Sequence, residues 1–210
     1  MKTKSIAIVT RTFNRPEYFK RCRDSVEKNN LGDNHYVLYQ DKQDESYLNG
    51  YQMKKKFIDQ STLKNEGKLD KPEALHNLHF NEIYSDIEED WVYHLDDDNI
   101  LFENAFEPFT NILESDADVI ICRYKLELKN RIIPSKSLFR RKIIRVNHID
   151  TLCFIIRTDF AKTIKWDGYS AGDYRYIKKA VDASRCIKWV DHLVGCRDYY
   201  GGGGAEDMND

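Results

Sequence analysis

The sequence has no long apolar segment. A helix that crosses a bilayer needs about 20 apolar residues in succession, and no stretch of this 210-residue chain approaches that length. The opening residues, MKTKSIAIVT, contain too short an apolar run for a secretory signal peptide and no small-residue cleavage site. We therefore expect a cytoplasmic protein without a membrane anchor.

A strong charge of either sign is also missing. The 33 lysines and arginines and the 35 aspartates and glutamates give a net charge of −2. Proteins that bind nucleic acid through its phosphates need a basic surface, so the overall charge predicts no nucleic-acid partner. The composition, 41% hydrophobic and 32% charged residues, is typical of a globular protein.

Closely spaced cysteines are absent as well. The chain has five cysteines, an odd number, and no CxxC pair. Secreted disulfide frameworks use even numbers of cysteines, and structural zinc sites use close pairs. We expect reduced thiols and no cysteine-bound metal.

What the chain does contain is an alternation of strand-like and helix-like segments. Residues 5–10 and 35–41 predict buried strands, and a helix over 16–28, with proline in its first turn, lies between them. Strand, helix and strand at this spacing indicate a parallel α/β sheet. The same patterns predict strands at 90–95, 118–128, 131–134, 142–146, 151–157 and 186–194, and helices at 48–58, 72–87, 103–113, 158–164 and from 173 onward.

The length and these elements predict one domain over residues 1–200. Four glycines at 201–204 then begin a polar segment, GGGGAEDMND. Glycine-rich segments of this kind are flexible. We expect residues 201–210 to be a tail, or a linker to further domains.

Three consecutive aspartates, Asp96, Asp97 and Asp98, follow the strand predicted at 90–95. Ligands of open α/β sheets bind at the carboxyl ends of the strands, and neighbouring carboxylates suit Mg²⁺ or Mn²⁺. The alternative is a solvated acidic turn in which Asp98 or Asn99 caps the next segment. The residues alone leave both interpretations open.

An EF-hand is excluded for these aspartates. Its loop needs an oxygen ligand at the fifth position and glycine at the sixth. Counted from Asp96, these positions hold Ile100 and Leu101.

Three segments together resemble the family 2 nucleotide-sugar glycosyltransferases of the GT-A fold. They are the first strand with TRTFNRPEYFKRCRDSV, the second strand ending in Asp41, and WVYHLDDDN. The resemblance extends from Ser5 to about His192. It implies an α/β fold with a doubly wound, mostly parallel central sheet and helices on both faces, the first half binding the nucleotide and the second half the acceptor.

The resemblance also implies roles for positions near the first two strands. Thr10, Arg11 and Thr12 match the family's loop that holds the nucleotide. Asp41 matches the acidic residue that contacts the base or the ribose.

The triple aspartate matches the family's acidic signature. There the first aspartate faces the ribose and the third binds the metal, which implies nucleotide-sugar binding by Asp96 and Mn²⁺ or Mg²⁺ binding by Asp98. Asp97, between them, is placed with the nucleotide-sugar site.

Two further matches lie downstream. Asp173, in AGDYRYI, is similar to the acid that activates the acceptor hydroxyl, although aspartate is also a strong helix N-cap. His192 is placed like a histidine that ligates the metal in many GT-A enzymes, although it equally fits a half-buried histidine. Trp166 and Tyr169, in WDGY, are candidates for stacking on an acceptor sugar, or for filling the core.

The sequence departs from the family pattern in two places. The family often has an Arg-Asn pair before the aspartates, and here Phe80 precedes Asn81. The cationic contact to the nucleotide is then either lost or supplied by another residue, such as Arg11 or Arg123. The family's glycine-rich loop before the late strand is also absent near 150–151, which affects how the donor sugar is positioned.

Taken together, these features predict a metal-dependent glycosyltransferase. It would move a hexosyl or deoxyhexosyl group from a UDP- or dTDP-linked sugar to a hydroxyl of a glycan or glycoprotein, with inversion. A narrower likeness to a virus-encoded member of the family implies the host cytoplasm. The alternatives are a nucleotidyltransferase, which usually has a glycine-rich phosphate loop with lysine that TRTFNRP lacks, and a non-catalytic relative that binds nucleotide or glycan.

Overall fold

The computed structural model describes residues 4–63 and 72–197. The glycine-rich segment at 201–210 lies outside the described residues. The strands form one nine-stranded sheet. They are β1 Ile6–Thr12, β2 His35–Tyr39, β3 Lys54–Phe57, β4 Trp91–His94, β5 Asn99–Leu101, β6 Val119–Leu126, β7 Arg131–Ile133, β8 Phe154–Arg157 and β9 Ile187–Arg197.

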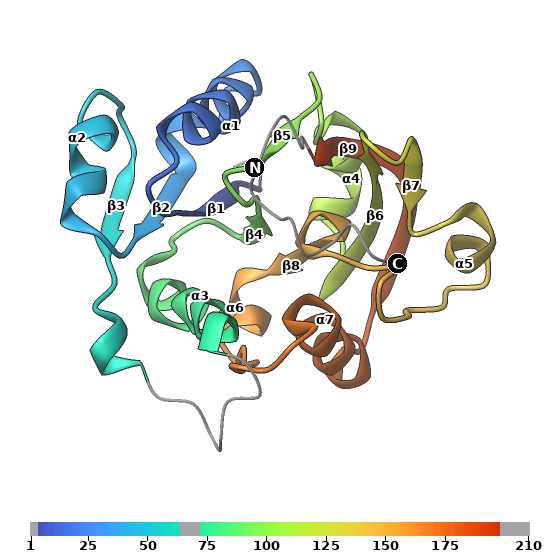
Figure 1. The fold of residues 1–210 in the computed structure, drawn as a ribbon. Helices are drawn as coiled ribbons and strands as arrows, with labels where there is room; N and C mark the ends of the chain where they lie inside the picture. The colour runs from blue at the N-terminus through green and yellow to red at the C-terminus, as the bar shows by residue number, and fades with distance from the viewer. Residues whose placement is uncertain (1–3, 64–71, 198–210) are drawn as a thin grey trace.

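The order of the strands is β3-β2-β1-β4-β8-β6-β9-β5, and β7 pairs with β6 off this path. The first four strands are parallel to one another, and β8 lies antiparallel between β4 and β6. Because β9 is parallel to β6, only β5, β7 and β8 run against the other strands. The predicted mostly parallel sheet is therefore confirmed, with its antiparallel pairs in the second half (Figure 1).

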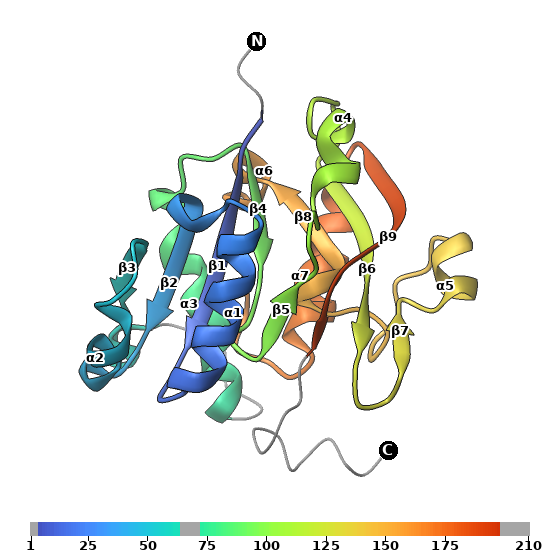
Figure 2. The same ribbon diagram turned by 90° about the horizontal axis from the view of Figure 1, so that it is seen from above.

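Helices cover both faces of the sheet, as predicted. Figure 2 shows α1 and α4 on one face and α3 and α7 on the other. The helices are α1 Pro16–Lys28, α2 Glu45–Leu48, α3 His79–Ile83, α4 Thr110–Leu113, α5 Lys136–Arg140, α6 Thr158–Ala161 and α7 Gly172–Ala183. None of the helices in the described ranges combines the length and apolarity that a bilayer crossing requires.

The central strands are apolar because helices cover them on both sides. All residues of β2 and β4 are buried, and so are Ile6–Thr10 of β1. This is the pattern expected of a sheet covered on both faces. Helix α1 buries Phe19, Cys22 and Val26 against the sheet. All five cysteines are free, as predicted.

Two predicted helices have a different structure. Of residues 48–58, only Leu48 is helical, as the end of α2, and 54–57 form the edge strand β3 beside β2. Exposed lysines suit an edge strand because they discourage further pairing. Residues 72–87 form a 3₁₀ segment, the short helix α3 and a second 3₁₀ turn. The five-residue step from Leu78 to Ile83 interrupts the 3.6-residue period that a continuous helix needs.

Three other boundaries are corrected by the structure. In the helix predicted at 103–113, Pro108 lies in a 3₁₀ turn and only Thr110–Leu113 is α-helical, since proline cannot donate within a helix. Residues 142–146 form no strand, and Lys142 has a positive φ of 55°. The strand predicted at 151–157 begins at Phe154, after a 3₁₀ turn.

Candidate active site

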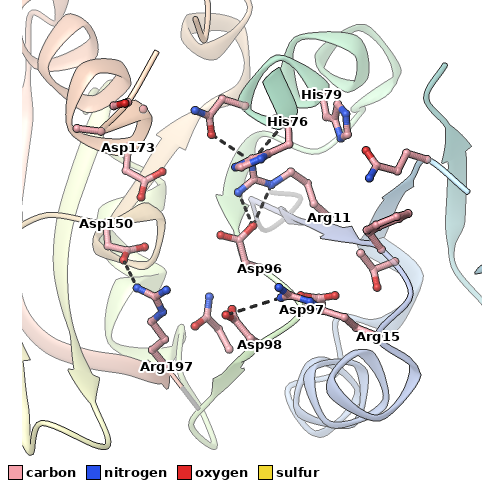
Figure 3. A pocket seen from close by; sticks show the side chains of 18 of the residues that line it. Arg11, Arg15, His76, His79, Asp96, Asp97, Asp98, Asp150, Asp173 and Arg197 are labelled. Atoms are coloured by element: carbon pink, nitrogen blue, oxygen red, sulfur yellow. Dashed lines mark hydrogen bonds and ion pairs between the residues drawn. The ribbon is translucent and has the colours of Figure 1, made fainter. Parts of the chain in front are cut away.

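A cavity of about 560 Å³ opens where β1 and β4 end. Segments far apart in the sequence meet there: the loop after β1, the turn after β4, the residues before α3, the start of α7 and the end of β9 (Figure 3). The predicted site residues among its lining are Arg11, Thr12, Asp96, Asp97, Asp98, Tyr169 and Asp173. The cavity therefore brings the acidic turn and the predicted base into one site.

Asp96 is held by an arginine from the neighbouring strand. Nε and Nη2 of Arg11 donate to Oδ1 of Asp96 at 3.0 and 2.7 Å. The guanidinium also lies 4.2 Å from the centre of the Phe80 ring and donates to Oδ1 of Asn77 at 3.3 Å. Burial alone would raise the pKa of Asp96, but the charge and hydrogen bonds of Arg11 outweigh it and lower that pKa.

Asp97 is more deeply buried and less well compensated. Its side chain is 4% exposed, and Oδ1 accepts from Nη1 of Arg15 at 3.1 Å. Oδ2 is buried and has no hydrogen-bond partner within residues 4–63 and 72–197. Burial raises the pKa of Asp97 to about 7, against the opposing charge of Arg15.

Asp98 has the weakest partner of the three. Its Oδ2 lies 3.9 Å from Nη1 of Arg15, which already donates to Asp97. Burial, followed by repulsion from Asp96, raises the pKa of Asp98. The cavity is lined by three arginines, Arg11, Arg15 and Arg197, and by five aspartates, Asp96, Asp97, Asp98, Asp150 and Asp173. Its carboxyl groups therefore outnumber its arginines, which favours the binding of a cation.

Asp173 faces the acidic turn from the start of α7 (Figure 3). It is half-buried and forms no hydrogen bond with the described residues. Burial raises its pKa well above the usual value, and repulsion from Asp150 and Asp96 adds to this. The N-cap of α7 is Ala171, with a left-handed φ of 54°, so the capping role considered for Asp173 is not found.

The position of α7 depends on a close approach at Gly172. A Cβ atom there would collide with the side-chain amide of Asn77. Asn77 is also the residue whose Oδ1 accepts from Arg11, and its Nδ2 contacts the backbone oxygen of Tyr169 at 3.4 Å. One small residue therefore allows the helix that carries Asp173 to pack beside the Arg11–Asp96 pair.

Sequence reasoning missed the role of three charged residues in this site: Arg15, Asp150 and Arg197. Asp150 accepts from the hydroxyl of Tyr124 at 3.0 Å and lies 3.8 Å from Nη1 of Arg197. Arg15 lies in the segment TRTFNRPEYFKRCRDSV, which carries part of the family resemblance, so its place after β1 could have indicated a role in the site. Arg197 ends β9, and no local pattern marked it.

Thr10 and Thr12 differ in their access to the cavity. Thr10 is fully buried, and its hydroxyl lies 2.8 Å from Nε2 of His35. Its side chain is therefore outside the cavity lining, and its nucleotide contact stays a prediction. Thr12 lines the cavity and contacts the hydroxyl of Tyr47 at 3.0 Å. Asp41 is outside the lining, and its Oδ1 accepts from the backbone of Gln43 at 2.9 Å.

His192 and Trp166 also lie outside the cavity lining, and metal binding by His192 stays a prediction. His192 is absent from the cavity lining and packs edge-on against Phe109, 5.7 Å between ring centres. Trp166 is 2% exposed and stacks on Tyr176 with ring centres 4.1 Å apart. It is a core residue and has no free face for a sugar, whereas Tyr169 lines the cavity.

No family model matches the chain, and no curated protein matches its sequence. Solved structures do share its fold. TarS 1–349 of Staphylococcus aureus, in complex with UDP-GlcNAc, has a TM-score of 0.71 at 18% identity, over 95% of this chain and 60% of that one. The fold is of the GT-A glycosyltransferase type.

Two further GT-A structures support this assignment. The mannosyltransferase PcManGT of Pyrobaculum calidifontis, in complex with GDP-Man and Mn²⁺, has a TM-score of 0.66 at 9% identity, over 93% of this chain and 57% of that one. Glucosyl-3-phosphoglycerate synthase of Mycobacterium tuberculosis, in complex with Mn²⁺, UDP-glucose and phosphoglyceric acid, has a TM-score of 0.60 at 13% identity, over 94% of this chain and 73% of that one. The chain thus spans about 60% of the TarS fragment. The virus-encoded likeness stays a prediction.

Proposed function

We propose that this chain is a metal-dependent glycosyltransferase that moves a hexosyl or deoxyhexosyl group from a UDP- or dTDP-linked sugar to a hydroxyl of a glycan or glycoprotein. The observation that carries the proposal is the placement of an under-compensated acidic turn and an unpartnered carboxylate, Asp173, across one cavity. The GT-A fold supports it, because the similar structures include complexes with nucleotide sugars.

The residues present fit a hard divalent cation. Oxygen ligands are those that Mn²⁺ and Mg²⁺ prefer, and Mg²⁺ takes only one or two carboxylates when phosphates supply other ligands. Asp98 would hold the ion. Beside it, Oδ2 of Asp97 and Oδ1 of Asn99 are buried oxygens that accept no hydrogen bond from the described residues. Among the described residues, no group of three or more acidic, histidine or cysteine side chains is arranged to hold a metal ion. When bound, the ion neutralises charge on the departing diphosphate.

The donor would be held by groups on both sides of the turn. Both bonds from Arg11 go to Oδ1 of Asp96, which leaves Oδ2 as the acceptor for a ribose hydroxyl. Arg15, with a side chain 37% exposed, is available to the diphosphate. Asp41 follows Gln40, which lines the cavity, and remains our candidate for a base or ribose contact.

Asp173 would be the general base. It accepts the proton of the acceptor hydroxyl while that oxygen bonds to the anomeric carbon, and the bond from this carbon to the diphosphate breaks. The electron pair leaves with the nucleoside diphosphate. A single displacement of this kind inverts the anomeric configuration.

The test is calorimetric titration of UDP, dTDP and GDP, with and without Mn²⁺, followed by a donor-hydrolysis assay with the corresponding sugar nucleotide. We expect one diphosphate to bind in a metal-dependent way and Asp98→Ala to abolish this binding. Asp33→Asn, an exposed aspartate outside the cavity lining, is the matched control and should bind normally. If no diphosphate binds to folded wild-type protein, the proposal is wrong; if one binds but its sugar is never released, the chain is a non-catalytic relative.

A further inference from the structure

A second hollow, of about 350 Å³, adjoins the first. It is lined by the end of β6, the turn to β7, residues 147–149 and the start of α7. Four residues line both spaces: Asp150, Ala171, Asp173 and Arg197. A molecule in this second hollow would therefore also reach Asp173.

The two spaces differ in charge. The first holds Asp96, Asp97 and Asp98, none of which lines the second. The residues found only in the second hollow include Lys129, Arg131 and His148 and no aspartate or glutamate. We call this end of the second hollow, defined by those three residues, the basic groove.

The cations of the basic groove are not neutralised by acidic side chains. Within the described residues, neither Lys129 nor Arg131 is paired with a carboxylate, and the neighbouring Glu127 is paired with Lys125. Arg131 contacts Nδ1 of His148 at 3.4 Å. Burial lowers the pKa of His148, and the charges of Arg131 and Arg145 lower it further, as expected near uncompensated positive charge.

A neutral sugar gains little from such a groove, because hydroxyl groups need no net positive charge. A phosphate or carboxylate gains a point charge from Lys129 and a planar pair of donors from Arg131. The other end of the second hollow contains Asp173 and Asp150. Asp150 already accepts a hydrogen bond from Tyr124 and forms an ion pair with Arg197. The second hollow thus offers a place for an anion at the basic groove and for a hydroxyl beside Asp173.

We infer that the basic groove binds an anionic acceptor, one that carries a phosphate or carboxylate group in addition to the hydroxyl that receives the sugar. The anion contacts Lys129 and Arg131 and orients the hydroxyl toward Asp173. This inference rests on the proposed function, since it names the acceptor class of the same site. It adds that charge, besides sugar shape, selects the acceptor.

The test measures binding of three probes to the full chain: glucose 6-phosphate, glucuronate and methyl glucoside. The first cavity is saturated beforehand with Mn²⁺ and the nucleoside diphosphate that the titration identifies. The first two probes share a sugar ring with the third but carry a phosphate or a carboxylate. We expect at least one anionic probe to bind more tightly than methyl glucoside, and the stronger of the two identifies the anion. The affinity of that probe should decrease when the salt concentration is raised from about 0.05 M to about 0.5 M, because Lys129 and Arg131 are exposed and salt screens exposed charges.

Charge reversal assigns the binding to this groove. The double substitution Lys129→Glu with Arg131→Glu should lower the affinity for the anionic probe on the order of tenfold or more, since two charged contacts are removed. Lys136→Glu with Arg140→Glu, the same change at exposed positions outside both cavity linings, is the control and should leave probe affinity unchanged.

The outcomes separate this inference from the proposed function. Binding of a nucleoside diphosphate with no preference for anionic probes, or with a preference that the charge reversal leaves intact, overturns the inference and leaves the proposed function standing. Absence of binding of UDP, dTDP and GDP alike to folded protein overturns the proposed function. In that case the inference about an acceptor fails with it, even if the groove still binds an anion.

Discussion

Arg11 places two hydrogen bonds on a single oxygen, Oδ1 of Asp96, at 3.0 and 2.7 Å. The two residues lie on adjacent parts of the sheet, since β1 and β4 are parallel neighbours. Both side chains are largely shielded from water, 14% and 26% exposed. The pair therefore fixes the first aspartate of the turn and keeps it ionised, as the lowered pKa of Asp96 indicates.

The first prediction concerns the loss of this arginine. Arg11→Met should lower the free energy of unfolding by about 1–3 kcal/mol, because it leaves a partly buried carboxylate without its partner. Urea denaturation measures this loss. Asp96→Asn in the Arg11→Met background removes the uncompensated charge and should restore part of the stability. If the double variant loses as much unfolding free energy as the two single variants lose in sum, the pairing is contradicted.

The second prediction concerns the contact between α7 and Asn77. Alanine is normally a better helix residue than glycine, yet Gly172→Ala should destabilise the fold because its Cβ would collide with the Asn77 amide. The expected loss is about 1–3 kcal/mol, as for other overpacked sites. In an Asn77→Ala background the obstruction is gone, so the same substitution should become neutral or stabilising. A loss of equal size in both backgrounds, measured by thermal or urea unfolding, would rule out this contact as the cause.

The third prediction follows from the raised pKa of Asp173. A group whose folded-state pKa lies above its unfolded value stabilises the fold fully below the unfolded pKa, and that stability is lost as pH rises through the folded pKa. Asp173→Asn has no such group. The stability of this variant relative to wild type should therefore increase as pH rises above the usual aspartate pKa of about 3.9.

Urea denaturation of both proteins across this pH range, without nucleotide or metal, checks the direction. Asp33→Asn, at an exposed position, is the control. In the transfer assay, Asp173→Asn should keep UDP binding and lose on the order of 10²–10⁴ in turnover, the usual contribution of a general base. Unchanged turnover would exclude Asp173 as the base.

Part of this fold was predictable because burial on both faces leaves a strong local pattern. The runs at β1, β2, β4 and β6 are nearly continuous in apolar residues, and each was predicted within a few positions. Edge elements carry less of that pattern. Strand β3 is KKKF, and β5 has only three residues paired with β9, so neither was recognised.

The site shows the same division. The acidic turn was predictable, because a run of aspartates after a buried strand marks the carboxyl edge of a sheet. The alternation of β1 also contained information that the family resemblance overrode: side chains alternate along a strand, so Thr10 and Arg11 point to opposite faces. Thr10 accordingly lies in the core beside His35, while Arg11 reaches Asp96.

Local sequence patterns were enough to predict the α/β class and the position of the acidic turn, whereas Asp173 became a candidate base only through the family resemblance. The tertiary structure decided which distant charges meet. It placed Arg197 rather than His192 in the cavity and Arg15 beside Asp97, and it put Trp166 in the core. Such meetings depend on strand register and helix packing between segments remote in the chain, which no local spacing specifies.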